Sequence, residues 1–376
     1  MPKTNDVDVN NQGFTNEQYE ELKQAQNDKK KNKELTEDQK KLLEESKEKK
    51  KNRDTAISIL RGISIRMPMI LYGADMQNED EEITLDNFTN LIDPQSWEEF
   101  MPKGVTKEKF NTFKKYYDKD IFAAAGKRIR ELARIADAMD IEERIERITS
   151  IFTTFRNPDK ETVLTPWRVV NMHLGDTLGG YVFYDEAMNE RLEAPRYVDK
   201  GDVTADVFSP SSRILEINSK SGLYPLYVAY NIYRQRLETD NKSFTISEDA
   251  VEKRRLHHLS IWDDVLRNNL FIVCKTPMAR NITKRTLAGF RGTKVKTHCF
   301  DDLINQITNK KENFISKVTS GSFWGLTDIK DMKFNAIVGN PPYQIVNKGD
   351  GTGADPIYHL FIDIAGKLGS ISTLIH

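Results

Sequence analysis

The sequence predicts an α/β fold in which a doubly wound sheet of buried strands follows an all-helical region. Three observations support this: a charged and polar lead, then apolar residues at helical spacing, then short apolar runs that alternate with helix-like segments. These changes in composition and apolar spacing predict a charged helical or disordered segment over 1–54, a helical domain over 55–158 and an α/β domain over 159–376.

The lead segment is dominated by Lys, Glu, Asp, Asn and Gln, which favours a solvated helix or a disordered linker. Two capping-box patterns, Thr15 with Gln18 and Thr36 with Gln39, each predict the start of a helix. The lysine runs at 29–31 and 49–51 are interleaved with acids, so contact with a DNA backbone is only the second interpretation of them.

Apolar residues recur at steps of three and four from 55 to about 155, which predicts a helical domain. The apolar stretch Met67–Tyr72 is expected to be broken by Pro68 and closed by Gly73. The aromatic residues of this region are expected to be core rather than base-stacking residues.

The α/β part contains apolar runs of strand length, separated by helix-like segments near 222–237, 278–288, 301–307 and 356–368. Short buried strands that alternate with helices are typical of a doubly wound sheet. The expected strands are 214–217, 270–273, 295–299, 334–338 and 371–375.

Composition excludes several classes of protein. The formal net charge is −1, so any surface that binds nucleic acid must be local. The two cysteines, Cys274 and Cys299, rule out a disulfide framework and a four-cysteine zinc site, and no metal site is expected. No apolar stretch approaches the length of a membrane span and no signal-peptide pattern begins the chain, so the expected compartment is the cytoplasm, without a membrane partner.

The strongest chemical signal is an apolar strand that leads directly into Asn340-Pro341-Pro342-Tyr343. Ligands of open α/β sheets bind beyond the carboxyl ends of the strands. Two consecutive prolines fix the backbone and remove its donors, so the segment offers mainly carbonyl oxygens. The alternative without function is a proline-rich turn that ends a strand.

This arrangement suits methyl transfer to a planar amine such as adenine N6, whose lone pair is delocalised into the ring. The Asn340 side-chain oxygen and the Pro341 carbonyl would accept the N–H bonds and favour a pyramidal nitrogen. Tyr343 would stack on a base that has left the duplex.

These residues resemble motif IV of the amino-methyltransferases, and their surroundings are similar to the Eco57I-like restriction–modification methylases. The resemblance implies a partial Rossmann-like methyltransferase fold that uses S-adenosyl-L-methionine to methylate adenine N6 in double-stranded DNA. It places Thr165 and Pro166 in motif X, with Thr165 also a good N-cap and Pro166 at the first helical position. Motif I gives Glu216 and Gly222 as cofactor contacts, and Lys220 stands where the first glycine usually lies.

Motif II departs from the family's pattern, because no acid follows the strand at 270–273 where one usually binds the ribose. Asp301, after the next strand, is the expected acceptor for the cofactor's adenine amino group, with helix N-capping as its alternative role. The glycines around Thr352 suggest a mobile lid over the target base.

The family's sheet has seven strands in the order 3-2-1-4-5-7-6, and this sequence is expected to supply strands one to four and to stop within the fifth, at His376. The expectation is therefore a truncated product, completed by a missing C-terminal target-recognition part or by a partner chain. The recognition sequence, the oligomeric state and the activity of the isolated chain are left open.

Two alternatives remain beside the DNA adenine methyltransferase. A protein glutamine methyltransferase of the release-factor type also uses Asn-Pro-Pro-Tyr, because an amide nitrogen poses the same lone-pair problem. A catalytically dead fragment that retains a helical interaction domain is the non-enzymatic alternative.

Overall fold

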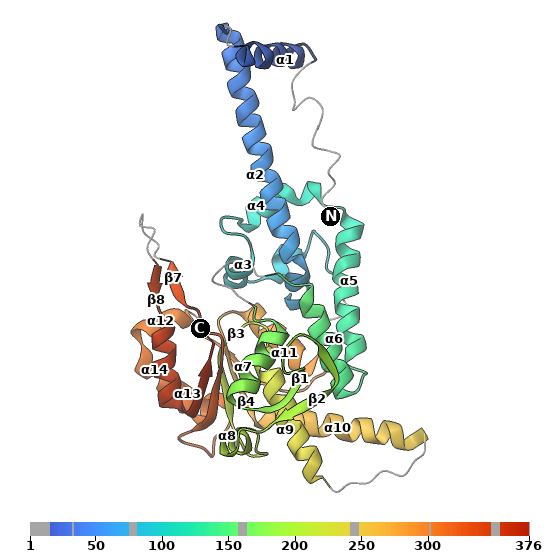
Figure 1. The fold of residues 1–376 in the computed structure, drawn as a ribbon, viewed down its shortest axis with the longest axis vertical. Helices are drawn as coiled ribbons and strands as arrows, with labels where there is room; N and C mark the ends of the chain where they lie inside the picture. Colours follow the sequence, from blue (N-terminus) through green and yellow to red (C-terminus); the bar gives the residue numbers. More distant parts are fainter. Residues whose placement is uncertain are drawn as a thin grey trace.

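The computed structural model describes residues 16–31, 34–74, 81–156, 164–240, 248–300, 302–346 and 354–375. The first half of these residues is helical, and the helices extend away from the sheet in Figure 1, with α1 at the far end of α2. The helices are α1 (Asn16–Lys30), α2 (Glu37–Gly73), η2 (Phe88–Leu91), α3 (Pro94–Phe100), α4 (Lys107–Phe113), η3 (Lys114–Tyr116), α5 (Lys119–Ala136) and α6 (Ile141–Thr153).

Helix α2 begins with the capping box that the sequence predicts. The backbone N–H of Gln39 donates to Thr36 Oγ1 at 3.2 Å, and the N–H of Thr36 donates to Gln39 Oε1 at 3.1 Å. The prediction that Pro68 breaks the helix is wrong, because α2 runs through it to Gly73. Burial of the last two turns, from Met67 to Gly73, stabilises the helix despite the donor that proline lacks. The other predicted capping box, at Thr15, lies outside the described residues.

Five parallel strands form the main sheet in the order β5-β4-β3-β6-β9. All five predicted strands are confirmed, and the order matches the first five strands expected from the resemblance. The strands are β3 (Ile214–Ser219), β4 (Leu270–Cys274), β5 (Lys296–Cys299), β6 (Phe334–Gly339) and β9 (Gly369–Leu374).

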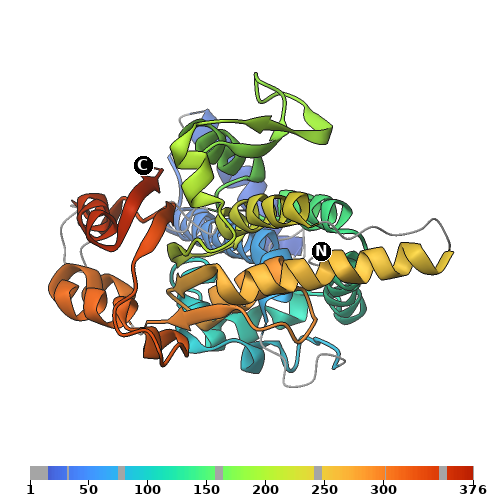
Figure 2. The same cartoon turned by 90° about the horizontal axis from the view of Figure 1, so that it is seen from below.

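Helices cover both faces of this sheet, as a doubly wound fold requires. Successive strand residues belong to different cores: Ile214 and Ile272 join one buried cluster, whereas Leu215 and Phe271 join the other. Figure 2 separates the orange and red helices after β5 from the yellow-green α9 on the opposite side. The helices are α7 (Trp167–Thr177), α8 (Asp202–Val207), α9 (Leu223–Thr239), α10 (Glu248–Asn268), α11 (Pro277–Ala288), α12 (Leu303–Asn309), α13 (Lys311–Thr319), η4 (Gly321–Trp324) and α14 (Tyr358–Leu368).

Two small antiparallel hairpins were not predicted. The first pairs β1 (Gly180–Tyr184) with β2 (Arg191–Val198), and it follows α7. The second pairs β7 (Gln344–Val346) with β8 (Ala354–Pro356), directly after the Asn-Pro-Pro-Tyr segment.

The helical region and the sheet share one buried cluster, which runs from Leu60 through α11 to the strands. Arg144 on α6 is the main polar link, with its side chain 1% exposed and 3.2 Å from Asp137. Its guanidinium also donates to the backbone oxygens of Thr286 and Arg285 at the end of α11. Because α2 crosses residue 54 without a break, the division of the chain at that point stays a prediction.

No helix in the described ranges is both long and apolar enough to cross a membrane. Within the same residues, no cluster of three or more His, Cys, Asp and Glu side chains is arranged to hold a metal ion.

Candidate active site

Several residues singled out in the sequence, among them Glu216 and Asn340, lie on or just after β3 and β6, two neighbouring strands of the sheet. These strands are parallel neighbours, with Glu216 opposite Val338. The chain leaves β3 toward α9 on one face of the sheet, and leaves β6 toward α14 on the other. This is the topological switch point of the fold, where doubly wound sheets hold their ligands.

Glu216 is a buried carboxyl group near the end of β3, 5% exposed. Burial raises its pKa to about 8, against smaller opposing effects from a hydrogen bond with Ser219 and the charge of Lys220. Within the described residues, its Oε2 atom has no hydrogen-bond partner. A buried carboxyl oxygen without a donor is costly, so this group suits a ligand that brings one.

The turn after β3 is held tightly against α11. Asn218 adopts a left-handed backbone with φ of 69°, and Gly222 does so with φ of 75° as it begins α9. A Cβ at Gly222 would meet the backbone of Thr283 at 3.0 Å, so a side chain there would displace the turn. The Asn218 Oδ1 atom is buried and, among the described residues, has no partner. The turn thus presents a second unsatisfied acceptor near Glu216.

Thr165 and Asn340 are 175 positions apart in the sequence and are joined by a hydrogen bond. The Asn340 amide donates from Nδ2 to Thr165 Oγ1 at 2.9 Å. Thr165 is not the N-cap of the following helix: Pro166 occupies that place and α7 begins at Trp167. Because this contact commits the nitrogen of the Asn340 amide, its oxygen is the atom left to accept from a ligand.

The prolines after Asn340 lead the chain out of the sheet to a partly exposed aromatic ring. Pro341 is buried, whereas Tyr343 is 42% exposed. The Tyr343 carbonyl accepts from Ile357 N at 3.0 Å and thereby closes the base of the β7–β8 hairpin. The ring is therefore outside the core, on a backbone fixed on both sides.

Tyr224, in the first turn of α9, is a site residue that the sequence did not reveal. Burial, Glu216 and Tyr343 raise its pKa well above the ordinary range, and a hydrogen bond with Thr165 acts against them. Its hydroxyl lies 3.1 Å from His173 Nδ1. The only local signal is an aromatic residue just after the glycine turn, and such a residue is more often core.

His173 on α7 continues this network toward the last strand. Its Nε2 atom lies 2.8 Å from the hydroxyl of Thr373 on β9. The same hydroxyl donates to Thr177 at 2.9 Å. These contacts tie α7, α9 and β9 together across the edge of the sheet where Asn340 and Glu216 lie.

The end of β4 carries Cys274 in place of an acid, as the sequence indicates. Burial raises the pKa of its thiol well above the ordinary range, so the group is neutral. Just beyond it, Thr276 caps α11 and donates to Glu99 Oε2 at 2.6 Å. Glu99 belongs to α3, so the helical region reaches this edge of the sheet. Asp301 and the glycine loop around Thr352 lie outside the described residues.

The sheet order, the switch point and the polar residues at the strand ends define a Rossmann-like methyltransferase fold preceded by helices. Residues 268–375 match the family model of the Eco57I restriction-modification methylase. This part of the chain, which contains β4 to β9 and the Asn-Pro-Pro-Tyr segment, is similar to that family. No curated protein matches the chain. The family suggests a DNA methyltransferase.

Proposed function

We propose that this chain is the catalytic part of a site-specific DNA adenine-N6 methyltransferase of a restriction–modification system. The observation that carries the proposal is the hydrogen bond from Asn340 to Thr165, which orients the amide at the switch point. Asn340 thereby keeps an oxygen acceptor at the edge of the sheet where β3, the strand that carries Glu216, ends at Ser219. Site-specific methylation of DNA is an activity that fits both the geometry of this site and the family that residues 268–375 match.

The residues after β3 fit the methionine end of S-adenosylmethionine. Its ammonium group brings the donors that Glu216 Oε2 and Asn218 Oδ1 lack within the described residues. The first N–H groups of α9, beyond Gly222, are suited to its carboxylate. Thr165 and Pro166, which directly precede α7, would contact the same end of the cofactor. When bound, the cofactor supplies an electrophilic methyl group on a positively charged sulfur.

The target amine would be held by two oxygen acceptors, the Asn340 side chain and the Pro341 carbonyl. Accepting both N–H bonds draws the exocyclic nitrogen away from planarity and makes its lone pair available. Because Thr165 already holds the Asn340 amide, little reorganisation is needed when the amine arrives. The same acceptors favour release of a proton once the nitrogen is methylated.

Tyr343 would provide the stacking surface for the flipped base. Its ring is 42% exposed, although its backbone is held by Ile357. Stacking of a base on an aromatic ring contributes about 1–3 kcal/mol, which offsets part of the cost of extrusion.

The test is transfer of tritium-labelled methyl from S-adenosylmethionine to duplex DNA, with the product nucleoside identified after digestion. The proposal predicts label in N6-methyladenine, and loss of that label in Asn340→Ala. Asn313→Ala, an exposed asparagine on α13, is the matched control and should retain the wild-type signal. Label on protein instead of DNA would favour the glutamine alternative, and label on another base would refute the adenine assignment.

A further inference from the structure

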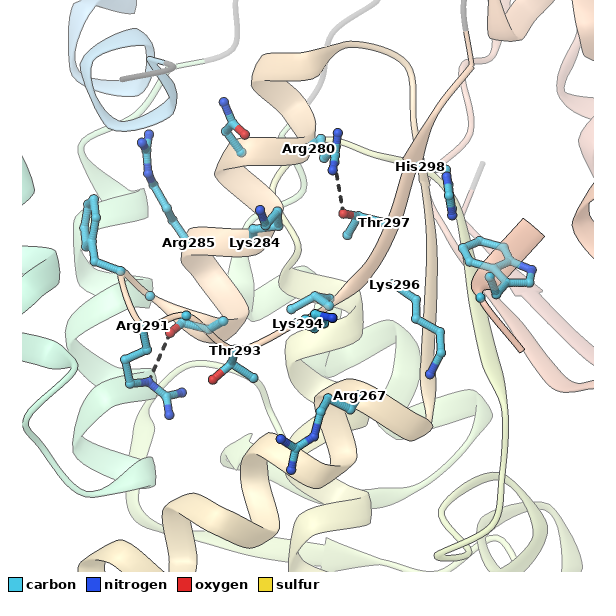
Figure 3. A pocket seen from close by; sticks show the side chains of 18 residues that line it. Arg267, Arg280, Lys284, Arg285, Arg291, Thr293, Lys294, Lys296, Thr297 and His298 are labelled. Carbon is cyan, nitrogen blue, oxygen red and sulfur yellow. Dashed lines mark hydrogen bonds between the residues drawn. The ribbon is translucent and has the colours of Figure 1, made fainter. Parts of the chain in front are cut away.

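A second cavity lies apart from the switch point, against the outermost strand of the sheet. Its volume is about 670 Å³, and it lies between α11, the following loop at 289–294 and β5 (Figure 3). β5 is the edge strand of the five-stranded order. We call this cavity, from Arg267 and Lys294 to Arg280 and His298, the basic groove.

The basic groove is strongly and one-sidedly charged. Seven of the lining side chains are lysine or arginine, and none is a carboxylate, in a chain whose formal net charge is −1. Arg291 is compensated by Asp263 at 2.7 Å. The side chains of Arg267 and Lys294 are exposed and form no hydrogen bond or ion pair with the described residues. A concentration of positive charge of this kind attracts a polyanion.

Contacts with the helical region hold the wall of the groove in place. Phe290 N donates to Asp137 Oδ2 at 2.7 Å, and Asp137 is paired with the buried Arg144. Gly289 passes so close to Asp137 that a Cβ would lie 1.8 Å from its Oδ1 atom. The guanidinium groups of three arginines lie 5.1–5.4 Å from the Phe290 ring centroid. The helical region therefore fixes this loop from behind.

Burial and neighbouring arginines disfavour the charged forms of two residues in the groove. Burial lowers the pKa of Lys296, and the nearby Arg213 lowers it further, against a smaller opposing effect of Asp264. Burial and Arg280 similarly lower the pKa of His298. A bound anion would relieve this repulsion, which adds to the geometric case for an anionic ligand.

The shape and lining favour a nucleic-acid backbone over a free anion or an exposed base. From Lys296 to Cys299 the strand rises roughly 10 Å, which matches the axial rise of about three nucleotides in one DNA strand. The aromatic rings of the lining already have partners: Trp324 is 4% exposed, two arginine guanidinium groups lie 5.1 and 5.2 Å from the Phe290 ring centroid, and the His298 ring packs on Phe323 at 4.1 Å. Such a lining contacts phosphates and does not stack on bases.

We propose that the basic groove binds the phosphodiester backbone of duplex DNA outside the target-base pocket, in a manner independent of sequence. This inference rests on the proposed function for its partner and adds a second contact surface to it. Arg280 and His298 lie near the carboxyl edge of the sheet (Figure 3). Asn340 directly follows β6 at the same edge, so a backbone that follows the groove arrives at the side where Asn340 is located.

The test is fluorescence anisotropy of a labelled duplex from about 50 to about 200 mM salt, for the wild type and for the triple variant Arg267→Gln/Arg280→Gln/Lys294→Gln. All three side chains are exposed, so the fold should survive. The slope of log affinity against log salt should become shallower by about 0.9 for each lost phosphate contact, or about 3 in all. A control with the same charge change uses the exposed residues of the helical region Lys103→Gln/Arg128→Gln/Arg147→Gln and should keep the wild-type slope.

An unchanged slope and affinity in the triple variant would overturn the inference, as would a wild type that does not bind the duplex. Displacement of the duplex by inorganic phosphate at matched ionic strength would assign the groove to a free anion instead. A wild type that binds the duplex through the groove but transfers no methyl group to it would count against the proposed function alone.

Discussion

Glu216→Gln should remove a pH dependence of stability that the wild-type protein carries. Burial raises the pKa of the folded carboxyl to about 8 from an ordinary 4.5. The folded state therefore binds a proton more readily than the unfolded state between these values, and stability falls as the pH rises through this window. At about 1.36 kcal/mol per pKa unit, the full loss is roughly 5 kcal/mol.

Glutamine resembles the neutral carboxyl in shape. The free energy of unfolding of the variant should therefore not exceed that of the wild type at about pH 5, and should be higher than that of the wild type at about pH 9. Urea unfolding across this range measures the difference. Glu45→Gln, an exposed change on α2, should leave the wild-type profile unaltered. Parallel profiles for the wild type and Glu216→Gln would refute the link between burial and protonation at this site.

Three further predictions follow from single contacts. Arg144→Met leaves Asp137 without its buried partner and should reduce the free energy of unfolding by about 3 kcal/mol in urea denaturation; a loss under about 1 kcal/mol would contradict this. Thr165→Val should slow methyl transfer while Thr165→Ser restores it, because serine still accepts from Asn340; equal rates for both would refute the orienting role. Tyr343→Ala should weaken the fluorescence rise of 2-aminopurine at the target position, and Tyr343→Phe should preserve it.

The main sheet was predictable because its strands are short, continuous apolar runs. The strand at 270–274 is fully buried and contains no polar residue apart from its cysteine, which periodicity detects directly. The strand at 191–198 escaped detection because it carries Pro195, two arginines and a glutamate, and its residues are half-buried or exposed. Its pairing with β1 is a tertiary preference that local sequence does not express.

Helix α10 was missed for a related reason. It is rich in charge, and among its described side chains, from 251 onward, the buried ones, including Trp262 and Val265, fall in its second half. At Pro68 the error is the opposite one, because the sequence predicted a break where the helix continues. Burial of the turns around Pro68 outweighs the low helix propensity of proline.

The candidate site was predictable only where its chemistry lies in one segment. Asn340 to Tyr343 are contiguous and follow a buried strand. The sequence alone therefore predicted both the motif and its place at the end of that strand. The contact between Thr165 and Asn340 depends on how α7 packs across the sheet. The buried position of Tyr224 beside Glu216 likewise depends on the fold, because neither residue is unusual in its own sequence neighbourhood.

The central claim is that the Asn340 oxygen acts on the target amine. It is tested most directly by single-turnover methyl transfer in Asn340→Ala, with cofactor and duplex binding measured separately. We expect a rate constant lower by about 100- to 1,000-fold with both binding affinities retained, in line with the loss of one preorganised polar group. A rate constant equal to that of the wild type would contradict it.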